Sequence, residues 1–281
     1  MNSRLSVIIV TYNRLVLLQR CLESLALQSD SFFDLVVVDN GSRDQTLKYL
    51  RSYSRERRYI NIIHFASPRP LFFCKESAIR QCDADYVAFL DDDCRACEQW
   101  VSVIKERLRD HAVIGGPVLP PPSLRYPFYW RTSMNWLIGV NRNPNERYLP
   151  LGSNCAFHRA LFELPFFSSR DAKRDDSSLP YAEDNFRIHS LLRAGYTCTV
   201  VENMKVTHMV GQDRLRFRYF IRRSIAEGKS LAVWQRGVAS LLRNLCALML
   251  FPLRFIVTLD PNRICRACVN ASYIYHFFFS S

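Results

Sequence analysis

The chain has 281 residues, of which 48% are hydrophobic and 23% charged, and these ordinary globular proportions exclude a wholly disordered chain. Its 9 glycines and 13 prolines exclude a collagen-like or low-complexity protein. The formal net charge of +12 is carried by 32 Arg against 6 Lys, so anionic ligands, phospholipid surfaces and nucleic acid are the partners to consider.

The first half of the chain alternates strand and helix patterns. The run Leu5–Val10 is continuously apolar and rich in β-branched residues, which is typical of a strand buried on both faces. It continues into Thr11 without a small-residue cleavage site, which favours a strand over a signal peptide. The alternation predicts an α/β fold with a doubly wound, mostly parallel sheet flanked by helices. The predicted strands are 5–10, 34–39, 59–65 and 86–90, and the predicted helices are 15–27, 44–53, 75–82 and 98–108.

Polar clusters follow several of the predicted strands. They are 11–14, 39–42 and the acidic triplet 91–93. In parallel sheets, ligands bind beyond the carboxyl ends of the strands, so these clusters predict a shared site. Three adjacent carboxylates repel one another by roughly a few kcal/mol unless a cation compensates them. Oxygen ligands suit Mg²⁺ or Mn²⁺, and the alternative interpretation is a solvated acidic turn.

The second half has a less regular pattern. Prolines and aromatic residues in 117–150 predict a long loop or small subdomain over the site. A helix is predicted over 183–194, because its apolar spacing ends before Gly195, a natural residue to follow a helix. Short strands are predicted at 196–201 and 205–207.

The composition changes near Ser230, which predicts a domain over 1–229 and an amphipathic helical segment over 230–281. Apolar residues dominate this segment, and Pro252 should interrupt its helix. Helical spacing places Arg236, Arg243 and Arg254 on nearly one face. Such a helix suits a membrane interface, and a helix packed on the domain with its arginines outward is the open alternative. No apolar stretch reaches the length of about 18 residues that a spanning helix needs.

The cysteine content indicates the cellular compartment of the protein. Without a predicted signal peptide, the 10 Cys indicate a reducing compartment and hence a cytoplasmic protein. Peripheral attachment to the inner face of the cytoplasmic membrane is the open alternative. Two Cys-Arg-Ala-Cys tetrads begin at Cys94 and Cys265, but their separation is far from that of a zinc ribbon, so coincidence is favoured.

Five segments, in order along the chain, resemble motifs of the family 2 glycosyltransferases, inverting enzymes with the Rossmann-like GT-A fold. They are VIIVTYNR (7–14), VVVDNGSRDQT (36–46), DYVAFLDDD (85–93), LGSNCAFHRALFE (151–163) and AEDNFRIHSLLRAGY (182–196). The resemblance implies transfer of a sugar from a nucleotide-diphosphate donor, most often a UDP-sugar. The acceptor would be a hydroxyl group of a saccharide or a lipid-linked saccharide, and a divalent metal, Mn²⁺ or Mg²⁺, would assist.

The resemblance also implies roles for individual residues. The nucleotide would contact Thr11, Tyr12, Asn13, Arg14, Lys75 and Asp92, with Asp39 accepting a hydrogen bond from the base. The metal ligands would be Asp91, Asp93 and His208. The donor sugar and acceptor would be lined by Gly152, Ser153, Asn154 and Glu183. Asp184 would be the general base, and the positive end of its helix favours an ionised carboxylate there.

The chain departs from the family pattern in places. Lys75-Glu76 stands where the family usually has an Arg-Asn pair. The stretch 216–230 lacks the Q-x-x-R-W motif of processive members, which favours transfer of a single residue.

Two other functions predict different sequence features. A catalytically inactive, membrane-associated binding or scaffold protein of the same fold should have lost the acidic triplet or Asp184, and both are present. Nucleic-acid binding would need a basic stripe interleaved with exposed aromatics. The candidate, 213–223, lies beside His208 and fits a diphosphate or lipid phosphate better, so no nucleic-acid partner is expected.

Overall fold

The computed structural model describes residues 3–57, 59–141, 152–164, 183–234 and 237–279. Within these ranges, the side chains at 183–186, 233–234, 253–254 and 257 lie outside the description. The chain divides into two compact units. The first contains the described residues up to 121, those of 152–164 and those of 184–209. The second contains 122–141, Glu183 and the described residues from 210 onwards.

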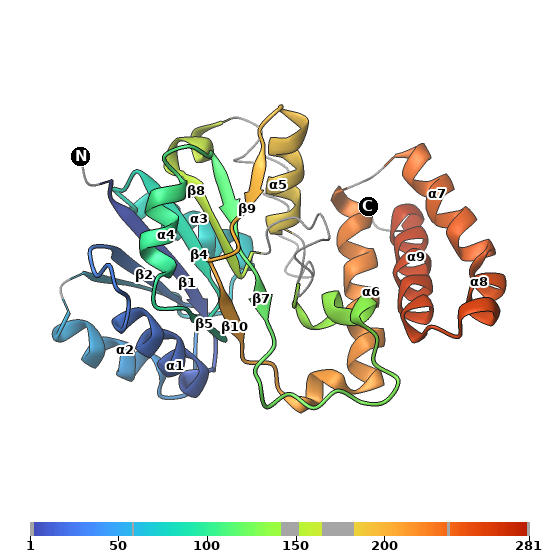
Figure 1. Cartoon of the computed structure of the whole chain (residues 1–281), viewed down its shortest axis with the longest axis horizontal. Coiled ribbons are helices and arrows are strands. Elements are labelled where there is room, and N and C mark those ends of the chain that lie inside the picture. The colour runs from blue at the N-terminus through green and yellow to red at the C-terminus, as the bar shows by residue number, and fades with distance from the viewer. Residues whose placement is uncertain (1–2, 58, 142–151, 165–182, 235–236, 280–281) are drawn as a thin grey trace. The chain divides into compact units, whose positions relative to one another are not determined.

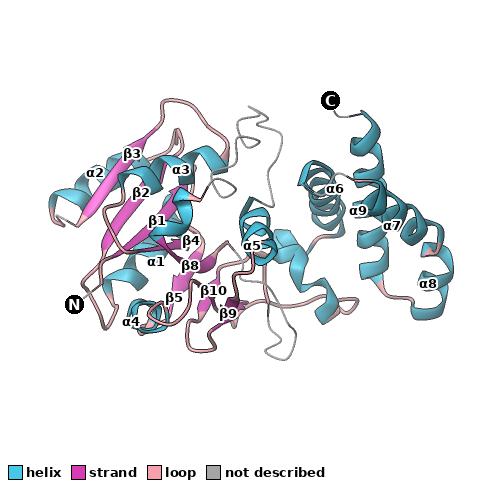
Figure 2. Ribbon diagram, turned by 90° about the horizontal axis from the view of Figure 1, so that it is seen from above, coloured by secondary structure: helices cyan, strands magenta, loops and turns pink. Residues whose placement is uncertain are grey.

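The first unit is built on a mixed, mostly parallel sheet, as predicted (Figures 1 and 2). Among the described residues its strand order is β3-β2-β1-β4-β8-β6-β9. Strand β8 runs antiparallel to both of its neighbours, and the other pairs are parallel. The strands are β1 (Leu5–Thr11), β2 (Asp34–Asp39), β3 (Ile60–His64), β4 (Tyr86–Leu90), β6 (Val113–Gly115), β8 (Asn154–His158) and β9 (Cys198–Val200).

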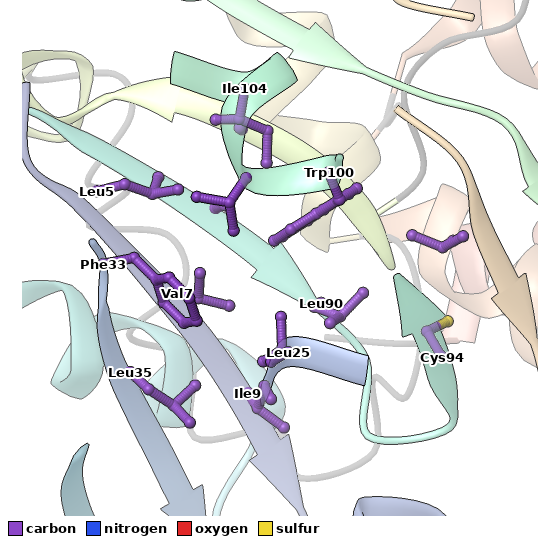
Figure 3. Close-up of a cluster of buried hydrophobic side chains, with 14 of the residues drawn as sticks. Leu5, Val7, Ile9, Leu25, Phe33, Leu35, Leu90, Cys94, Trp100 and Ile104 are labelled. Carbon is purple, nitrogen blue, oxygen red and sulfur yellow. The ribbon is translucent and has the colours of Figure 1, made fainter. Parts of the chain in front are cut away.

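Helices cover both faces of this sheet. They are α1 (Leu15–Ala26), α2 (Thr46–Arg55), α3 (Leu71–Gln81), α4 (Trp100–Arg107) and α5 (Glu183–Arg193). Successive side chains of β1 point to opposite faces, so Val7 and Ile9 pack in one hydrophobic cluster with α1 and α4 (Figure 3). Ile8 packs in the other cluster with α3 and α5. Each fully buried side chain of this size contributes about 1.5–3 kcal/mol, so both layers hold the sheet rigid behind the site.

A small second sheet brings the end of β4 together with a later segment of the chain. Its order is β5 (Cys94–Ala96), β10 (Val206–His208) and β7 (Val118–Leu119). His208 pairs with Cys94, directly after the acidic triplet. The prediction of a strand at 205–207 is confirmed, whereas β5, β6, β7 and β8 were not predicted. These strands are short or follow polar turns, so their sequences carry no clear alternation.

The second unit is helical. Its elements are η1 (Thr132–Ile138), η4 (Gln212–Leu215), α6 (Phe217–Trp234), α7 (Val238–Met249), α8 (Phe251–Thr258) and α9 (Pro261–Phe279). Helices α6 and α9 approach closely, because a Cβ at Gly228 would lie 2.2 Å from the carbonyl oxygen of Val269. The Ser272 hydroxyl adds a 2.7 Å hydrogen bond to the carbonyl of Ile225. The expected boundary at 229/230 therefore lies inside α6 rather than between elements.

The segment after α6 is interrupted, as its proline predicts. Helix α7 ends at Met249 and α8 begins at Phe251, with Pro252 in its first turn. Arg236 and the side chain of Arg254 lie outside the described residues, so the predicted common face of the arginines is described only at Arg243, which is exposed. In the described part of the chain, no helix combines the length and apolar character needed to cross a membrane.

Candidate active site at the carboxyl ends of the strands

Three segments converge on the acidic triplet that follows β4. The Thr11 hydroxyl, at the end of β1, donates a 2.8 Å hydrogen bond to Oδ2 of Asp92. The Arg14 guanidinium donates to Oδ1 of Asp92 at 3.0 Å and to Oδ2 of Asp93 at 3.2 Å. Nε2 of His208, at the end of β10, lies 3.2 Å from Oδ1 of Asp93. The sequence separates these residues by up to about two thirds of the chain. The parallel sheet brings Thr11 and Asp92 to one edge, and β10 of the small second sheet brings His208 beside the triplet.

Burial sets the electrostatics of this cluster. Asp92 and Asp93 are each 3% exposed. Burial raises the pKa of Asp92 to about 6, and the negative charge of Asp93 adds to the rise, while Arg14 and the Thr11 hydrogen bond oppose it. Burial by itself lowers the pKa of Arg14, but Asp92 and Asp93 outweigh it, so that pKa is raised overall. Arg14 therefore remains a cation held against buried carboxylates.

The residues present fit a divalent metal of the kind predicted. Of the predicted ligands, Asp93 and His208 lie together, with their nearest oxygen and nitrogen atoms 3.2 Å apart. That separation suits two ligands on neighbouring positions of one cation. In the described part of the chain, no group of three or more acidic, His or Cys side chains has metal-ligand spacing, and Asp91 does not complete one. Mg²⁺ typically takes one or two protein ligands, with waters and substrate phosphates filling its other positions.

The loop after β1 and the turn after β2 are fastened to each other. Asn13, with a positive φ of 53°, donates its N–H to the Ser42 hydroxyl at 3.0 Å. Its side-chain oxygen accepts the N–H of Arg43 at 2.7 Å. Gly41 has φ +81° and lies so close to Ser67 that a Cβ would be 2.9 Å from that backbone, so only glycine fits. Tyr12 lies in the loop after β1 and is 43% exposed.

Asp39 was predicted to accept a hydrogen bond from the nucleobase, but its carboxylate lies inside the protein. It is 0% exposed, and each of its oxygens has a partner within the protein. Oδ1 accepts the N–H of Ser42 at 3.2 Å, and Oδ2 lies 2.8 Å from Nδ1 of His64. His64 is the last residue of β3, and its side chain is 34% exposed. The solvent-facing group at this position of the sheet is therefore the imidazole, with the carboxylate behind it.

The Lys75-Glu76 pair lies on α3 and has a structural context of its own. Lys75 is 3% exposed, with Nζ 5.0 Å from the centroid of the Phe89 ring. Glu76 accepts a hydrogen bond from the guanidinium of Arg187, on α5. Arg187 is fully buried, and its guanidinium carbon lies 4.7 Å from the centroid of the Phe72 ring. The contact between Glu76 and Arg187 fastens α5 to α3. This contact accounts for an acid at a position where the family usually has Asn.

The acceptor-side segment contains β8 and the turn before it. Gly152 is partly exposed and Ser153 is buried. Asn154 is 0% exposed, and its oxygen accepts the indole N–H of Trp100 at 2.8 Å. Its amide nitrogen donates to the carbonyls of Pro117 and Met204 at 3.2 and 2.7 Å. Both amide hydrogens are used inside the protein, so the structure gives Asn154 a packing role.

This arrangement predicts a stability effect. Asn154→Ala should lower the free energy of unfolding by at least about 2 kcal/mol, because it leaves a buried indole N–H and buried carbonyls without partners. Chemical denaturation monitored by tryptophan fluorescence would measure it. Ser153→Ala is the matched control and should change stability by less than about 1 kcal/mol. Equal stability of the Asn154 variant and the parent would refute the packing role.

Some predicted residues lie outside the described side chains. These are Asp184 and Glu183, of which the structure describes only that the helix α5 begins at Glu183. Two residues with notable contacts in this region, His64 and Arg187, were not predicted from the sequence. His64 could have been found near the end of the predicted strand 59–65, which follows the predicted strand that ends in Asp39. Nothing in the local sequence indicates that Arg187 pairs with Glu76.

Comparison with known proteins identifies the family of the chain. Residues 6–168 match the family described as Glycosyl transferase family 2. Glycosyltransferase AglE of Haloferax volcanii is 33% identical over 98 residues, which cover 34% of this chain and 32% of that protein. The glucosyl-dolichyl phosphate glucuronosyltransferase of the same organism is 22% identical over 242 residues, 82% of this chain and 77% of that protein.

Solved structures show the same fold. The mannosyltransferase PcManGT from Pyrobaculum calidifontis, in complex with GDP-Man and Mn²⁺, has a TM-score of 0.57 and 18% identity, with 98% of this chain and 70% of that chain covered. Residues 1–349 of S. aureus TarS, in complex with UDP, have a TM-score of 0.53 and 18% identity, covering 98% and 90%. At these identities the similarity establishes the GT-A fold.

Proposed function

The chain belongs to glycosyl transferase family 2, and from this membership we propose that it is an inverting, metal-assisted transferase with a nucleoside-diphosphate sugar as donor. The proposed acceptor is a hydroxyl group of a saccharide or lipid-linked saccharide. One observation carries the proposal: Thr11, Arg14 and His208 converge on Asp92 and Asp93 at the carboxyl edge of the sheet. A buried carboxylate pair flanked by a cation and an imidazole suits recognition of a metal-bound diphosphate.

The chain's own residues account for the handling of the leaving group. Asp93 and His208 would hold the divalent cation, which when bound neutralises the diphosphate as the glycosidic bond breaks. The Arg14 side chain is 43% exposed while it contacts both carboxylates. A guanidinium has five N–H donors, so Arg14 can keep these contacts and offer its outer N–H groups to a phosphate oxygen.

Proton removal is assigned to the amino end of α5. Inversion needs the acceptor hydroxyl to attack the sugar opposite the departing diphosphate, with a base to take its proton. Asp184 is in the first turn of α5, where the helix dipole stabilises an ionised carboxylate. The ion pair between buried Arg187 and partly exposed Glu76 holds this helix against α3.

The experiment that tests the function is a screen of nucleotide sugars for metal-dependent hydrolysis and transfer. The full chain would be incubated with UDP- and GDP-sugars and Mn²⁺, with and without excess chelator, and release of the nucleoside diphosphate would be measured. Turnover of at least one donor that stops with chelator and returns with Mn²⁺ is expected. No binding of any nucleoside diphosphate would exclude the function.

A relative supports the proposed lipid-linked acceptor, and the second unit supports a proposed location at a membrane surface. A relative named above acts, by its name, on a glucosyl-dolichyl phosphate, a lipid-linked sugar. On α7 the exposed residues Val238, Leu242 and Met249, with exposures of 71%, 56% and 77%, recur at helical spacing and form one apolar stripe. The stretch 230–259 contains three Arg and no Asp or Glu. A basic segment that includes a helix with an exposed apolar stripe suits an anionic membrane surface.

This surface makes a prediction about membrane binding. The full chain should sediment with anionic vesicles at low salt and less with neutral ones. The double substitution Leu242→Glu and Met249→Glu should reduce the bound fraction severalfold, since both charges would enter the apolar stripe. Ala239→Glu, on the same helix but off the stripe, is the matched control. Truncation at residue 230 is a poorer test, because it cuts α6 and removes its partner α9. Equal binding of the double variant and the control would exclude the stripe as the membrane surface.

A further inference from the structure

A row of polar residues crosses the carboxyl edge of the main sheet. In the parallel register, Thr11 of β1 is opposite Asp39 of β2, and Asp39 is opposite His64 of β3. A hydrogen bond within the row joins Asp39 to His64, and another extends the row from Thr11 to Asp92. Neighbouring strands lie about 4.8 Å apart, so His64 is about 10 Å from the strand that bears Thr11. A nucleoside diphosphate whose phosphates lie at Asp92 is long enough to bring its base to His64.

The hydrogen bonds within the row define the tautomer of His64. A carboxylate oxygen only accepts, so the contact of 2.8 Å between Oδ2 of Asp39 and Nδ1 of His64 requires the hydrogen on Nδ1. In the neutral ring, Nε2 is then a hydrogen-bond acceptor. Among the residues that the structure describes, His64 makes no other hydrogen bond. With its side chain 34% exposed, the ring presents this acceptor to a ligand, while Asp39 is 0% exposed behind it.

The surrounding loops hold this arrangement in place. Asn40 exchanges two hydrogen bonds with the backbone of Arg69, at 2.9 and 2.8 Å, which ties the turn after β2 to the loop after β3. The backbone N–H of Ser42 donates to Oδ1 of Asp39 and fixes the carboxylate. The position of His64 is thus supported from both loops that flank it.

Resting on the proposed function, we infer that His64, oriented by Asp39, selects the nucleobase of the donor and favours bases with an N–H at the pairing edge. Uracil and guanine have such an N–H, on N3 and N1 respectively. Cytosine and adenine have a bare ring nitrogen at the equivalent position, and it would face the lone pair of Nε2. The acceptor that reads the base is therefore the imidazole, and Asp39 is a positioning residue that holds its tautomer.

Binding of the four common nucleoside diphosphates tests this inference. UDP, GDP, CDP and ADP would each be titrated against the full chain with Mn²⁺ by calorimetry. The parent should bind UDP or GDP at least about tenfold more tightly than CDP and ADP, which corresponds to one well-formed hydrogen bond against an unpaired acceptor. His64→Ala should weaken the preferred nucleotide and bring the four affinities close together. His111→Ala, at a distant partly exposed histidine, is the control and should leave the pattern unchanged.

Asp39→Asn gives a sharper result. The Ser42 N–H still needs the side-chain oxygen, so the new amide N–H₂ faces His64 and donates to Nδ1. The hydrogen of the ring then lies on Nε2, which becomes a donor, and the preference should shift towards CDP. Loss of selection in His64→Ala, or this shift in a folded Asp39→Asn, supports the inference. If the parent binds nucleotides and His64→Ala keeps the same preference, His64 does not select the base. If no nucleotide binds to the parent, the proposed function itself fails.

Discussion

Replacing Asp184 with Asn should lower turnover by at least about a hundredfold while donor affinity changes little, which is the usual scale of general-base catalysis. The substitution keeps the shape of the side chain and removes its ability to take a proton. A loss in kcat with an unchanged donor KM would indicate an interaction made in the transition state. Steady-state kinetics with the donor found in the screen would measure both quantities.

Glu183→Gln is the matched comparison, because it removes a carboxylate from the same turn of α5. Adjacent residues on a helix point about 100° apart, so both cannot occupy the same position beside the acceptor. Glu183 is proposed to bind acceptor hydroxyls or to cap the helix, so its variant should affect acceptor KM more than kcat. If Asp184→Asn turns over like the parent and Glu183→Gln is inactive, Glu183 is the base instead.

Asp93→Asn should lower metal-dependent turnover by at least about a hundredfold, since a metal acting on the leaving group supplies several kcal/mol. The variant should remain folded, because Arg14 still pairs with Asp92 at 3.0 Å. Titration of Mn²⁺ against the variant in the presence of UDP should show weakened binding. Excess chelator should abolish the activity of the parent, and added Mn²⁺ should restore it.

Asp110→Asn, at an exposed acid after α4, is the control for the loss of one negative charge and should keep parental activity. Full activity of Asp93→Asn, or of the parent in excess chelator, would remove Asp93 from the metal site. The turnover of His208→Ala would then show whether the imidazole beside Asp93 contributes to activity independently of Asp93.

The ion pair between Glu76 and Arg187 shows how a residue distant in the sequence can compensate a departure from a family pattern. From the sequence, an acid at position 76 weakens the expectation of phosphate contacts there. In the structure, that acid pairs with a fully buried arginine from the helix that begins at Glu183. A buried charge without a partner is costly, so each residue explains the presence of the other. Local sequence cannot reveal this, because 111 residues separate the two.

The local sequence was enough to predict the α/β alternation, the strands β1 to β4, the helices α1 to α4, the position of the acidic triplet and the family. These features depend on local periodicity and on motifs within a few residues, which do not need the tertiary structure. Strands β6 and β8 were missed because they have short or unpatterned sequences, and pairing with neighbours stabilises them. Only the tertiary structure decided that Asn154 is an interior residue, that Arg14 holds Asp92 and Asp93, and that His64 lies in front of Asp39. Burial and hydrogen-bond partners come from segments distant in the chain, and the parallel register that aligns Asp39 with His64 exists only once the sheet has formed.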